Sequence, residues 1–360
     1  MPSGEEPANP DAEWRERHVR YFKMCISILP HHYTGLDTSR MSLLYFGIIG
    51  LDMLGALEEV LGSRRQQVVD WVYNCQIPPR AAFQPAHCGF RGGPFLGHLY
   101  DPDHEGAEYA VSEYDSGHIA MTYTALAVLL TLGDDLARVH TADIIQAVAA
   151  LQREDGSFTA TLDGSECDMR YLYCACAIST MLGDWSGVNK DKAVEFIRQC
   201  LTFEGGISLV PDQEAHGGST FTAVAALVLM NRLDALTAQE LGDLELWCVH
   251  RQVGGFQGRC NKPPDTCYSF WVGGTLSLLG KTHLMHVEST HDFLEQCEQR
   301  IIGGYGKVPK APPDMLHTFY SLFFLSLSQL KELQPMDGAL AIRKSRLPQE
   351  LMPMRTAQTM

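Results

Sequence analysis

Apolar residues recur at helical spacing from residue 13 to residue 332, and no stretch alternates with the period of two that marks a half-buried strand. Clusters of Pro, Gly and Asp separate the helical stretches from one another. The pattern predicts twelve helices, at about residues 13–28, 41–58, 65–76, 117–132, 141–152, 168–182, 190–202, 217–232, 237–251, 265–279, 288–301 and 314–332. We therefore expect an all-α protein.

Glycine turns recur between these helices in a regular register. They read CGF (88–90), DGSF (155–158), GGI (205–207), GGF (254–256) and GGY (303–305). Their last residues lie at 158, 207, 256 and 305, a constant spacing of 49, and only the first copy at 90 departs from it. A polar residue opens the next helix nine or ten positions after the turn, at Asp168, His216, Asp265 and Asp314. The chain is therefore a repeated helical hairpin.

The two helices of each hairpin differ in character. Those after the polar opener are apolar nearly all round, whereas those before the glycine turn are amphipathic and charged. A helix that is apolar on all sides is surrounded by protein, so six inner and six outer helices are expected. Residues 13–333 are predicted to form a closed six-fold α–α barrel, a double ring rather than an open superhelix. All inner helices would then begin around one mouth.

The ends of the chain and its composition restrict the class of protein further. Residues 1–12 are predicted to be disordered, and residues 334–360 extended or disordered. The formal charge of −15 argues against a general nucleic-acid binder. No apolar run reaches the roughly 20 residues of a membrane helix, and the N-terminus lacks a secretory apolar region. Eleven cysteines without a CxxC pair indicate reduced thiols, so we expect a cytoplasmic protein.

Asp265, Cys267 and His317 form the first candidate site. Asp265 and Cys267 open the fifth inner helix, and His317 lies near the start of the sixth, its neighbour in a closed ring. Three such ligands with a free fourth position are typical of a catalytic zinc site, and the thiolate and imidazole favour zinc over magnesium or calcium. The alternative is an Asp helix cap, a buried Cys and a polar core His.

A second group at the predicted mouth is basic. It comprises His216, Arg259, Lys262, Arg170 and Lys307, with Tyr268 beside Cys267. Cations collected near helix N-termini indicate an anion site, most simply for a phosphate or diphosphate, although solvated loop cations are the alternative. Neither GxxxxGK[ST] nor GxGxxG is present, so a nucleotide is not implied.

Aromatic residues are expected between the inner helices. Trp271, Phe270, Tyr45 and Phe46 would line this space, although ordinary core packing accounts for most such side chains. A diphosphate site beside aromatic side chains suggests an isoprenoid diphosphate, which is charged at one end and apolar along the rest. A terpene cyclase is not favoured, because the sequence contains neither DxDD nor DDxxD.

Five segments together resemble the β subunits of protein prenyltransferases. They are LDTSRMSLLYFGIIGLDML (36–54), YDSGHIAMTYTAL (114–126), ECDMRYLYCA (166–175), HGGSTF (216–221) and GRCNKPPDTCYSFW (258–271). The resemblance covers about residues 13–333. It implies an α–α barrel, obligate pairing with a helical-repeat α subunit, and zinc-dependent transfer of a prenyl group to a cysteine thiol near a protein C-terminus.

The resemblance also implies roles for individual residues. The zinc ligands fall on Asp265, Cys267 and His317, which act with Tyr268 in catalysis. The diphosphate ligands fall on His216, Arg259, Lys262 and Tyr268, with Arg170 near the isoprenoid and Trp271 in its pocket. Ser42 stands where farnesyltransferases have a bulky Trp, which leaves room for a fourth isoprene unit. Lys307 stands where they have a magnesium-binding Asp, so magnesium is not expected to be required.

The forms HGGSTF and PDTCYSFW favour the type I geranylgeranyl branch, with geranylgeranyl diphosphate as donor and CaaX-terminated proteins such as small GTPases, typically with Leu last, as acceptors. By the same resemblance the acceptor pocket involves Thr38, His118, Ala120, Met121 and Tyr171. A farnesyl or Rab-type enzyme remains an alternative. The remaining alternative is a non-catalytic helical scaffold that binds peptides.

Overall fold

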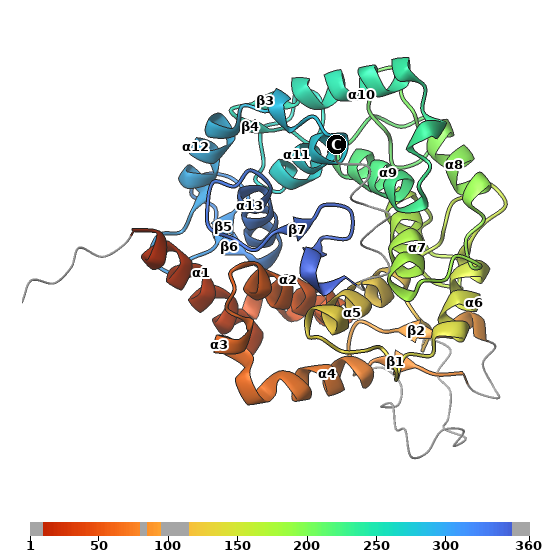
Figure 1. Ribbon diagram of the computed structural model, residues 1–360, viewed down its shortest axis with the longest axis horizontal. Coiled ribbons are helices and arrows are strands. Elements are labelled where there is room, and N and C mark those ends of the chain that lie inside the picture. Colours follow the sequence, from red (N-terminus) through yellow and green to blue (C-terminus); the bar gives the residue numbers. More distant parts are fainter. Residues whose placement is uncertain (1–9, 80–84, 95–114, 348–360) are drawn as a thin grey trace, which may run out of the picture.

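The computed structural model describes residues 10–79, 85–94 and 115–347 of the 360-residue chain. Six inner helices surround the centre, namely α2 (Arg40–Met53), α5 (Ile119–Thr131), α7 (Met169–Leu182), α9 (Gly217–Met230), α11 (Tyr268–Leu278) and α13 (Met315–Leu327). Six outer helices lie on the perimeter, namely α1 (Pro10–Ser27), α4 (Arg65–Tyr73), α6 (Thr141–Leu151), α8 (Lys190–Gln199), α10 (Ala238–His250) and α12 (Val287–Cys297) (Figure 1). A short additional helix, α3 (Leu57–Leu61), precedes α4.

The inner helices close into a ring, which confirms the predicted architecture. Each packs on the next in the order α2, α5, α7, α9, α11 and α13, and α13 packs back on α2. Every residue of α5 except Ala120 is buried. In α8 only Ala193, Val194, Phe196 and Ile197 are buried. This contrast is the one expected between a helix surrounded by protein and a helix with one solvent face.

Each glycine turn forms a very short antiparallel pairing that the helical pattern did not predict. The pairs are β1 (Gln76–Ile77) with β2 (Gly89–Phe90) and β3 (Gln252–Val253) with β4 (Gly255–Phe256). Single bridges to Phe158, Ile207 and Tyr305 replace them in the other repeats. A further pair, β5 (Tyr305–Gly306) with β6 (Pro313–Asp314), joins the residues after the last turn to the start of α13. Gly205, Gly254 and Gly303 have φ values of 94°, 78° and 83°, which residues with a Cβ rarely adopt. The regular glycines are therefore a backbone requirement.

The first outer helix completes the ring by joining the last turn. The indole of Trp14 donates to the hydroxyl of Tyr305 at 3.2 Å. The buried ring of His18 stacks on Tyr305 and accepts from the amide of Gly304 at 3.0 Å. Residues 10–12, which were expected to be disordered, form the first turn of α1, and residues 1–9 lie outside the described residues.

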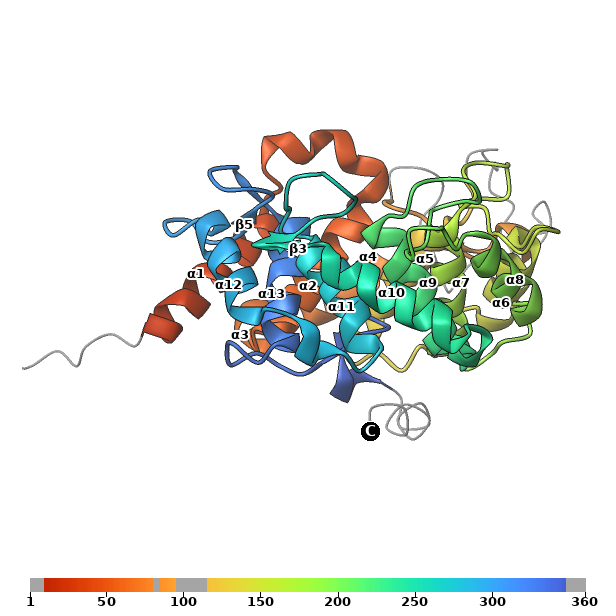
Figure 2. The same cartoon turned by 90° about the horizontal axis from the view of Figure 1, so that it is seen from above.

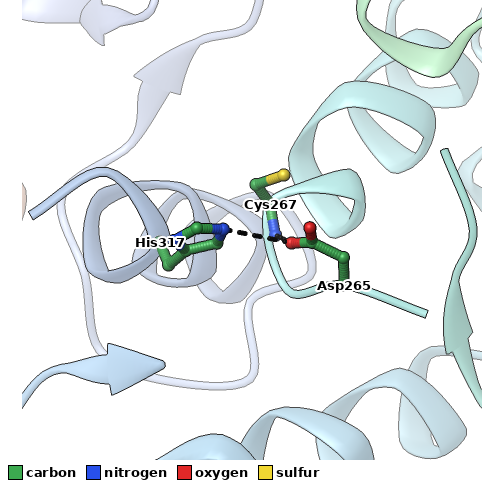
Figure 3. Close-up of side chains that lie close together, drawn as sticks. All are labelled: Asp265, Cys267 and His317. Carbon is green, nitrogen blue, oxygen red and sulfur yellow. Dashed lines mark hydrogen bonds and ion pairs between the residues drawn. The ribbon is translucent and has the colours of Figure 1, made fainter. Parts of the chain in front are cut away.

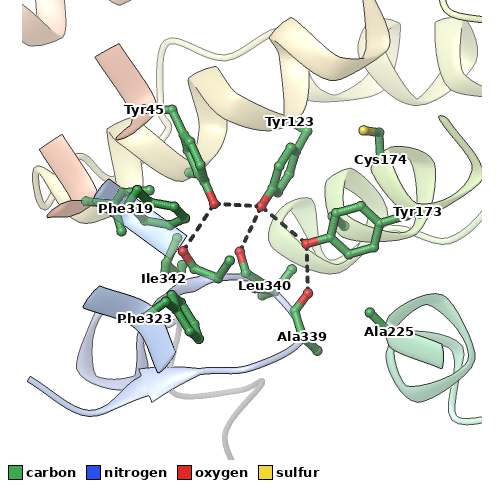
Figure 4. Packing of buried hydrophobic residues seen from close by; sticks show 14 of the residues in the cluster. Tyr45, Tyr123, Tyr173, Cys174, Ala225, Phe319, Phe323, Ala339, Leu340 and Ile342 are labelled. Atoms are coloured by element: carbon green, nitrogen blue, oxygen red, sulfur yellow. Dashed lines mark hydrogen bonds between the residues drawn. The ribbon is translucent and has the colours of Figure 1, made fainter. Parts of the chain in front are cut away.

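The C-terminal segment enters the centre of the ring instead of leaving it. Residues 336–343 form a hairpin of β7 (Met336–Asp337) and β8 (Ile342–Arg343), and Leu340 and Ile342 are fully buried. Three tyrosine hydroxyls bind its backbone: Tyr45 donates to Ala341 O at 3.3 Å, Tyr123 to Leu340 O at 3.0 Å and Tyr173 to Ala339 O at 2.8 Å (Figure 4). The prediction of an extended or disordered tail from residue 334 was wrong for this hairpin. Residues 348–360 lie outside the described residues.

The hairpin lies at the end of the ring opposite the starts of the inner helices. The amide of Gln334 donates to the carbonyl of Met53, the last residue of α2, and Arg346 forms an ion pair with buried Asp52 at 2.8 Å. In the side view of Figure 2 the dark blue end of the described chain, which contains this hairpin, lies at the face away from the loops that precede the inner helices. The inner helices therefore begin at one mouth, and the hairpin covers the other end. In the part of the chain that the structure describes, no helix combines the length and the apolar character needed to cross a membrane.

Candidate metal and diphosphate site

Asp265, Cys267 and His317 come together at the mouth, where α11 and α13 begin (Figure 3). One ligand atom from each lies within 4.8 Å of the others. Nε2 of His317 lies 3.3 Å from Oδ1 of Asp265, and that same oxygen accepts from the amide of Cys267 at 3.0 Å. A carboxylate, a thiol and an imidazole at this spacing are a donor set that suits zinc. The three residues thus fit the metal that the sequence predicts.

Asp314 holds His317 in position. It is the N-cap of α13, where Oδ1 accepts from the amide of His317 at 2.9 Å. Its other oxygen, Oδ2, lies 2.6 Å from Nδ1 of the same ring. A carboxylate on Nδ1 directs Nε2 toward the ligand cluster and makes it a better donor, as in many metal sites. The repeat pattern predicts Asp314 only as a helix opener, because its contact with Nδ1 depends on the rotamer of His317.

In the metal-free chain the pKa values of these three side chains are shifted in different directions. Burial, together with the carboxylate of Asp265, raises the pKa of the Cys267 thiol well above its usual value. Burial lowers the pKa of His317, but the hydrogen bonds that its ring donates to Asp265 and Asp314 outweigh burial and raise that pKa to about 9. Burial would raise the pKa of Asp265, yet contacts with His317 and Cys267 lower it. A metal ion bound here would therefore displace protons from the sulfur and the imidazole.

His216 and Tyr268 form a connected pair beside the metal ligands. His216 is the N-cap of α9, and its Nδ1 accepts from the amide of Gly218 at 2.9 Å. Burial and the nearby Arg259 lower the pKa of His216, so the ring is neutral at neutral pH. Since Nδ1 is an acceptor, Nε2 carries the proton and donates to the Tyr268 hydroxyl at 3.0 Å. The hydrogen of Tyr268 is then free to bind an anion.

The cations predicted for the anion site differ in their partners. Nζ of Lys307 lies 3.5 Å from Oδ2 of Asp265, so this ammonium borders the metal cluster directly. Arg259 pairs with exposed Glu214 at 3.3 Å, and Lys262 is exposed on the same loop. Arg170 binds the carboxylate of its own helix cap, Asp168, at 2.6 Å. Lys307, Arg259 and Lys262 therefore retain donors toward solvent at the mouth.

Arg170 forms two ion pairs within the chain that the sequence did not predict. Besides Asp168 it binds Glu166 at 2.7 Å, and Glu166 also accepts from the hydroxyl of Tyr171 at 3.1 Å. These hydrogen bonds raise the pKa of Arg170 above its usual value. Glu166 was not among the predicted site residues, and because it lies in the loop before α7, helical spacing does not indicate this contact.

Ser42 and Trp271, predicted for the isoprenoid pocket, are both half-buried although the helices around them are buried nearly throughout. Trp271 on α11 and Phe46 on α2 contact the ring of Tyr320 from opposite sides of α13, at 4.5 and 5.9 Å between centroids. Ser42 lies one turn before Phe46, and its hydroxyl lies 3.6 Å from the sulfur of Met121. Partly exposed aromatic side chains thus face the interior of the ring.

The residues predicted for the acceptor pocket lie mostly along α5 and α7. The rings of His118 and Tyr171 are 6.0 Å apart, and Met121 contacts Ser42. Half-buried Ala120 lies between His118 and Met121 on the same helix turn. Thr38 is exposed on the 3₁₀ helix His31–Ser39, which precedes α2. Four of the five are therefore near one another, and their role in binding an acceptor stays a prediction.

Comparison with known families identifies the class of the protein. A model of the prenyltransferase alpha-alpha toroid domain matches residues 14–342, almost the whole described chain. The chain belongs to this family. A Candida albicans protein geranylgeranyltransferase-I complexed with GGPP has the same fold, with a TM-score of 0.80 at 23% identity over 96% of this chain and 99% of that one.

Two relatives narrow the assignment. The geranylgeranyl transferase type-1 subunit beta of Dictyostelium discoideum is 37% identical over 91% of this chain and 95% of its own length. The Arabidopsis thaliana protein of the same description is 36% identical over 81% of this chain and 79% of its own length. The chain is thus a catalytic protein prenyltransferase β subunit and falls in the type I geranylgeranyl group.

Proposed function

We propose that the protein transfers the geranylgeranyl group of geranylgeranyl diphosphate to the cysteine thiol of C-terminal CaaX sequences, as the zinc-binding half of a heterodimer. The observation that carries this proposal is the cluster of Asp265, Cys267 and His317 beside Lys307 at the mouth of the ring. This arrangement supports a thiol-binding metal site next to a cation suited to a diphosphate. The type I relatives support the choice of donor and acceptor.

Asp265, Cys267 and His317 would hold the zinc ion, with Asp314 orienting the imidazole. Zinc bound there would lower the pKa of an acceptor thiol, so that the thiol could lose its proton at neutral pH. The protein's own groups would then stabilise the charge that develops on the leaving diphosphate. Tyr268, oriented by His216, donates a hydrogen bond, and the cations of the mouth supply positive charge. Such stabilisation is usually the largest catalytic contribution.

Lys307 makes a magnesium ion unnecessary in this proposal. Its ammonium lies 3.5 Å from Asp265 and is about 61% exposed, so it can reach a diphosphate without leaving the metal cluster. A fixed ammonium supplies the charge that a divalent ion would otherwise provide. We therefore propose zinc as the required metal and expect activity to persist when magnesium is removed.

The small side chain of Ser42 supports a long isoprenoid. A Trp at this position would contact Met121 and fill the space in front of it, since the Ser42 hydroxyl is already 3.6 Å from that sulfur. A farnesyl donor is the alternative, and donor competition separates the two. We also propose an α subunit as partner and a cytoplasmic location, which the eleven free thiols favour.

The test of the metal site uses binding as well as activity. We expect about one zinc per chain by metal analysis, and loss of zinc in Cys267→Ala and His317→Ala. Geranylgeranyl diphosphate should still bind both variants, because its proposed ligands His216, Arg259 and Lys262, at the start of α9 and on the loop before Asp265, are not among the metal ligands. A folded variant that loses donor affinity to the same degree as zinc would contradict this separation. Zinc retained in both variants would reject the site itself.

A further inference from the structure

A hydrogen bond to the next repeat holds the start of each inner helix in place. For α2, α5, α7, α9 and α11 the donor is a backbone amide, and the acceptor is a backbone carbonyl of the loop before the next inner helix. The pairs are Met41 with Gly92, Ile119 with Ala160, Met169 with Leu209, Gly217 with Gly258 and Thr266 with Lys307, at 2.8, 2.9, 3.1, 2.8 and 3.0 Å. We call these bonds the repeat links. The acceptors at 160, 209, 258 and 307 keep the spacing of 49, each two residues after the last residue of its glycine turn.

Helix α13 has no later glycine turn to bind. The donor that corresponds to Thr266 in the repeat is the amide of Met315, 49 residues further along the chain. The next helix around the ring is α2, which follows the 3₁₀ helix His31–Ser39 instead of a glycine turn. The hydroxyl of Tyr33 on this 3₁₀ helix accepts from the amide of Met315 at 2.8 Å. A side chain therefore forms the repeat link at the point where the ring closes.

The side chain of Tyr33 is held on several sides. It is 6% exposed, and its own amide donates to the carbonyl of Pro30 at 2.9 Å. The ring of His32 lies 4.2 Å from the ring of Tyr33, measured between centroids. Burial raises the pKa of Tyr33 to about 12, although hydrogen bonds with the amide of Met315 and with Tyr21 of α1 oppose this shift. The hydroxyl is therefore neutral across the physiological pH range and remains an acceptor for the amide.

The link at Tyr33 lies one peptide bond from the group that orients a metal ligand. The amide of Met315 belongs to the peptide bond that joins it to Asp314. The carboxylate of Asp314 accepts from the amide of His317 at 2.9 Å and lies 2.6 Å from Nδ1 of its ring. On the other side, Asp314 pairs with Tyr305 between β6 and β5. A shift of the Asp314–Met315 peptide would therefore move the carboxylate and turn the imidazole that it holds.

We propose that Tyr33 is a positioning residue for His317, an inference that rests on the proposed metal site. Its hydroxyl fixes the start of α13, and through Asp314 it keeps Nε2 of His317 directed at the other ligands. Supporting groups of this kind set the metal affinity of a site, because they hold its ligands in the binding geometry. The link at Thr266, beside the other two ligands, ends on the backbone carbonyl of Lys307, which a side-chain substitution leaves in place. The link that serves His317 ends on a side chain, so the loss of one hydroxyl removes it.

The experiment measures zinc affinity of the full chain paired with its α subunit, by competition with a chelator. Tyr33→Phe removes the acceptor and keeps the ring, and we expect zinc affinity to fall by about tenfold, the low end of the range for groups that orient a ligand. The visible absorption of the cobalt-substituted protein should also change, because the arrangement of the ligands changes. Unchanged zinc affinity and absorption in Tyr33→Phe would overturn the proposal.

Tyr73→Phe is the matched control. It removes a hydroxyl from a residue that is 1% exposed on the outer helix α4, where that hydroxyl donates to Asp134 at 2.6 Å. The change in the side chain is the same, but the helix carries none of the predicted metal ligands. We expect zinc affinity and cobalt absorption to be unchanged in Tyr73→Phe. An equal loss of zinc affinity in both variants would overturn the role of Tyr33 in positioning His317.

A double variant tests whether Tyr33 acts through Asp314. Because the two groups lie on one path to His317, we expect Tyr33→Phe with Asp314→Asn to lose less zinc affinity than the product of the two single losses. Losses that multiply would overturn this path.

Tyr21→Phe decides the question if Tyr33→Phe does not fold. It removes a hydrogen bond to Tyr33 and keeps the acceptor of the Met315 amide, so we expect a smaller loss of zinc affinity in the same direction. Unchanged affinity in that variant would overturn the proposal. Wild type that binds no zinc would reject the proposed metal site itself, whereas wild type and Tyr33→Phe that bind zinc equally tightly would reject this inference alone.

Discussion

At the scale of single residues, the site depends on groups that touch the metal ligands as much as on the ligands. Asp314 both caps α13 and binds Nδ1 of His317 at 2.6 Å. We expect Asp314→Asn to keep the cap and lower zinc affinity by about 10–100-fold, the usual range when such a carboxylate is changed. Competition with a chelator measures this affinity. Thr237→Ala removes the capping box of α10 and should lower stability by about 1 kcal/mol without changing zinc affinity.

Zinc affinity should rise with pH across the neutral range. The pKa of His317 in the metal-free chain is about 9, and that of Cys267 is raised further by burial. Both groups hold a proton at neutral pH, and zinc must displace both. Affinity is therefore expected to increase between about tenfold and a hundredfold per pH unit from pH 6.5 to pH 8.5. Calorimetry in buffers of different ionisation enthalpy counts the protons released, and a count of zero would contradict this account.

Ser42 is the residue on which donor length is expected to depend. Ser42→Trp would overfill the interior beside Met121, and overpacking typically costs about 1–3 kcal/mol. Since about 1.4 kcal/mol corresponds to a tenfold change, preference should move from the geranylgeranyl to the farnesyl donor by roughly tenfold to a hundredfold. The measurement is kcat/KM for both donors with one CaaX peptide. A Trp variant that keeps its geranylgeranyl preference would show that Ser42 does not limit donor length.

The repeat register allowed the clustering of Asp265, Cys267 and His317 to be predicted from sequence alone. Asp265 lies nine residues after its glycine turn, and His317 lies near the start of the next inner helix, so ring geometry brings them together. Register could not predict contacts that depend on side-chain rotamers. The bonds from Asp314 to His317 and from Lys307 to Asp265 are of this kind.

At the scale of elements, the C-terminal hairpin is held by a chain of tyrosine hydroxyls. Tyr123 lies between Tyr45 and Tyr173, at 3.1 and 3.2 Å, and donates to the carbonyl of Leu340. Tyr123→Phe would leave a buried acceptor unpaired, which typically costs about 1–3 kcal/mol. We expect a lower melting temperature by calorimetry with unchanged zinc content. Equal stability of the variant and wild type would mean that these bonds do not hold the hairpin.

Helices were predictable and the hairpin was not, for a physical reason. Each inner helix contains more than ten residues with a continuous apolar pattern, whereas β7 and β8 contain two residues each and follow Pro335. Two-residue strands carry no period. The hairpin contacts α13 and also α2 and α5, which are far away in sequence, and a local pattern cannot reveal these distant contacts.

At the scale of the whole molecule, closure of the ring brings the inner helices of successive 49-residue repeats together so that they begin around one mouth. Every inner helix starts at the same end, so residues from four repeats, among them His216, Asp265 and His317, share one site. Closure was predictable because the inner helices are apolar nearly all round and so require protein on every side.

The most direct test of the account is prenyl transfer by this chain paired with its α subunit. A peptide ending in CaaX with Leu last is incubated with equal geranylgeranyl and farnesyl diphosphate, and the products are separated by mass spectrometry. We predict a geranylgeranyl thioether on the cysteine in at least tenfold excess over farnesyl, with zinc present and magnesium chelated, and none with Cys267→Ala. A zinc-loaded pair that forms no thioether, or forms mainly the farnesyl product, would contradict the account.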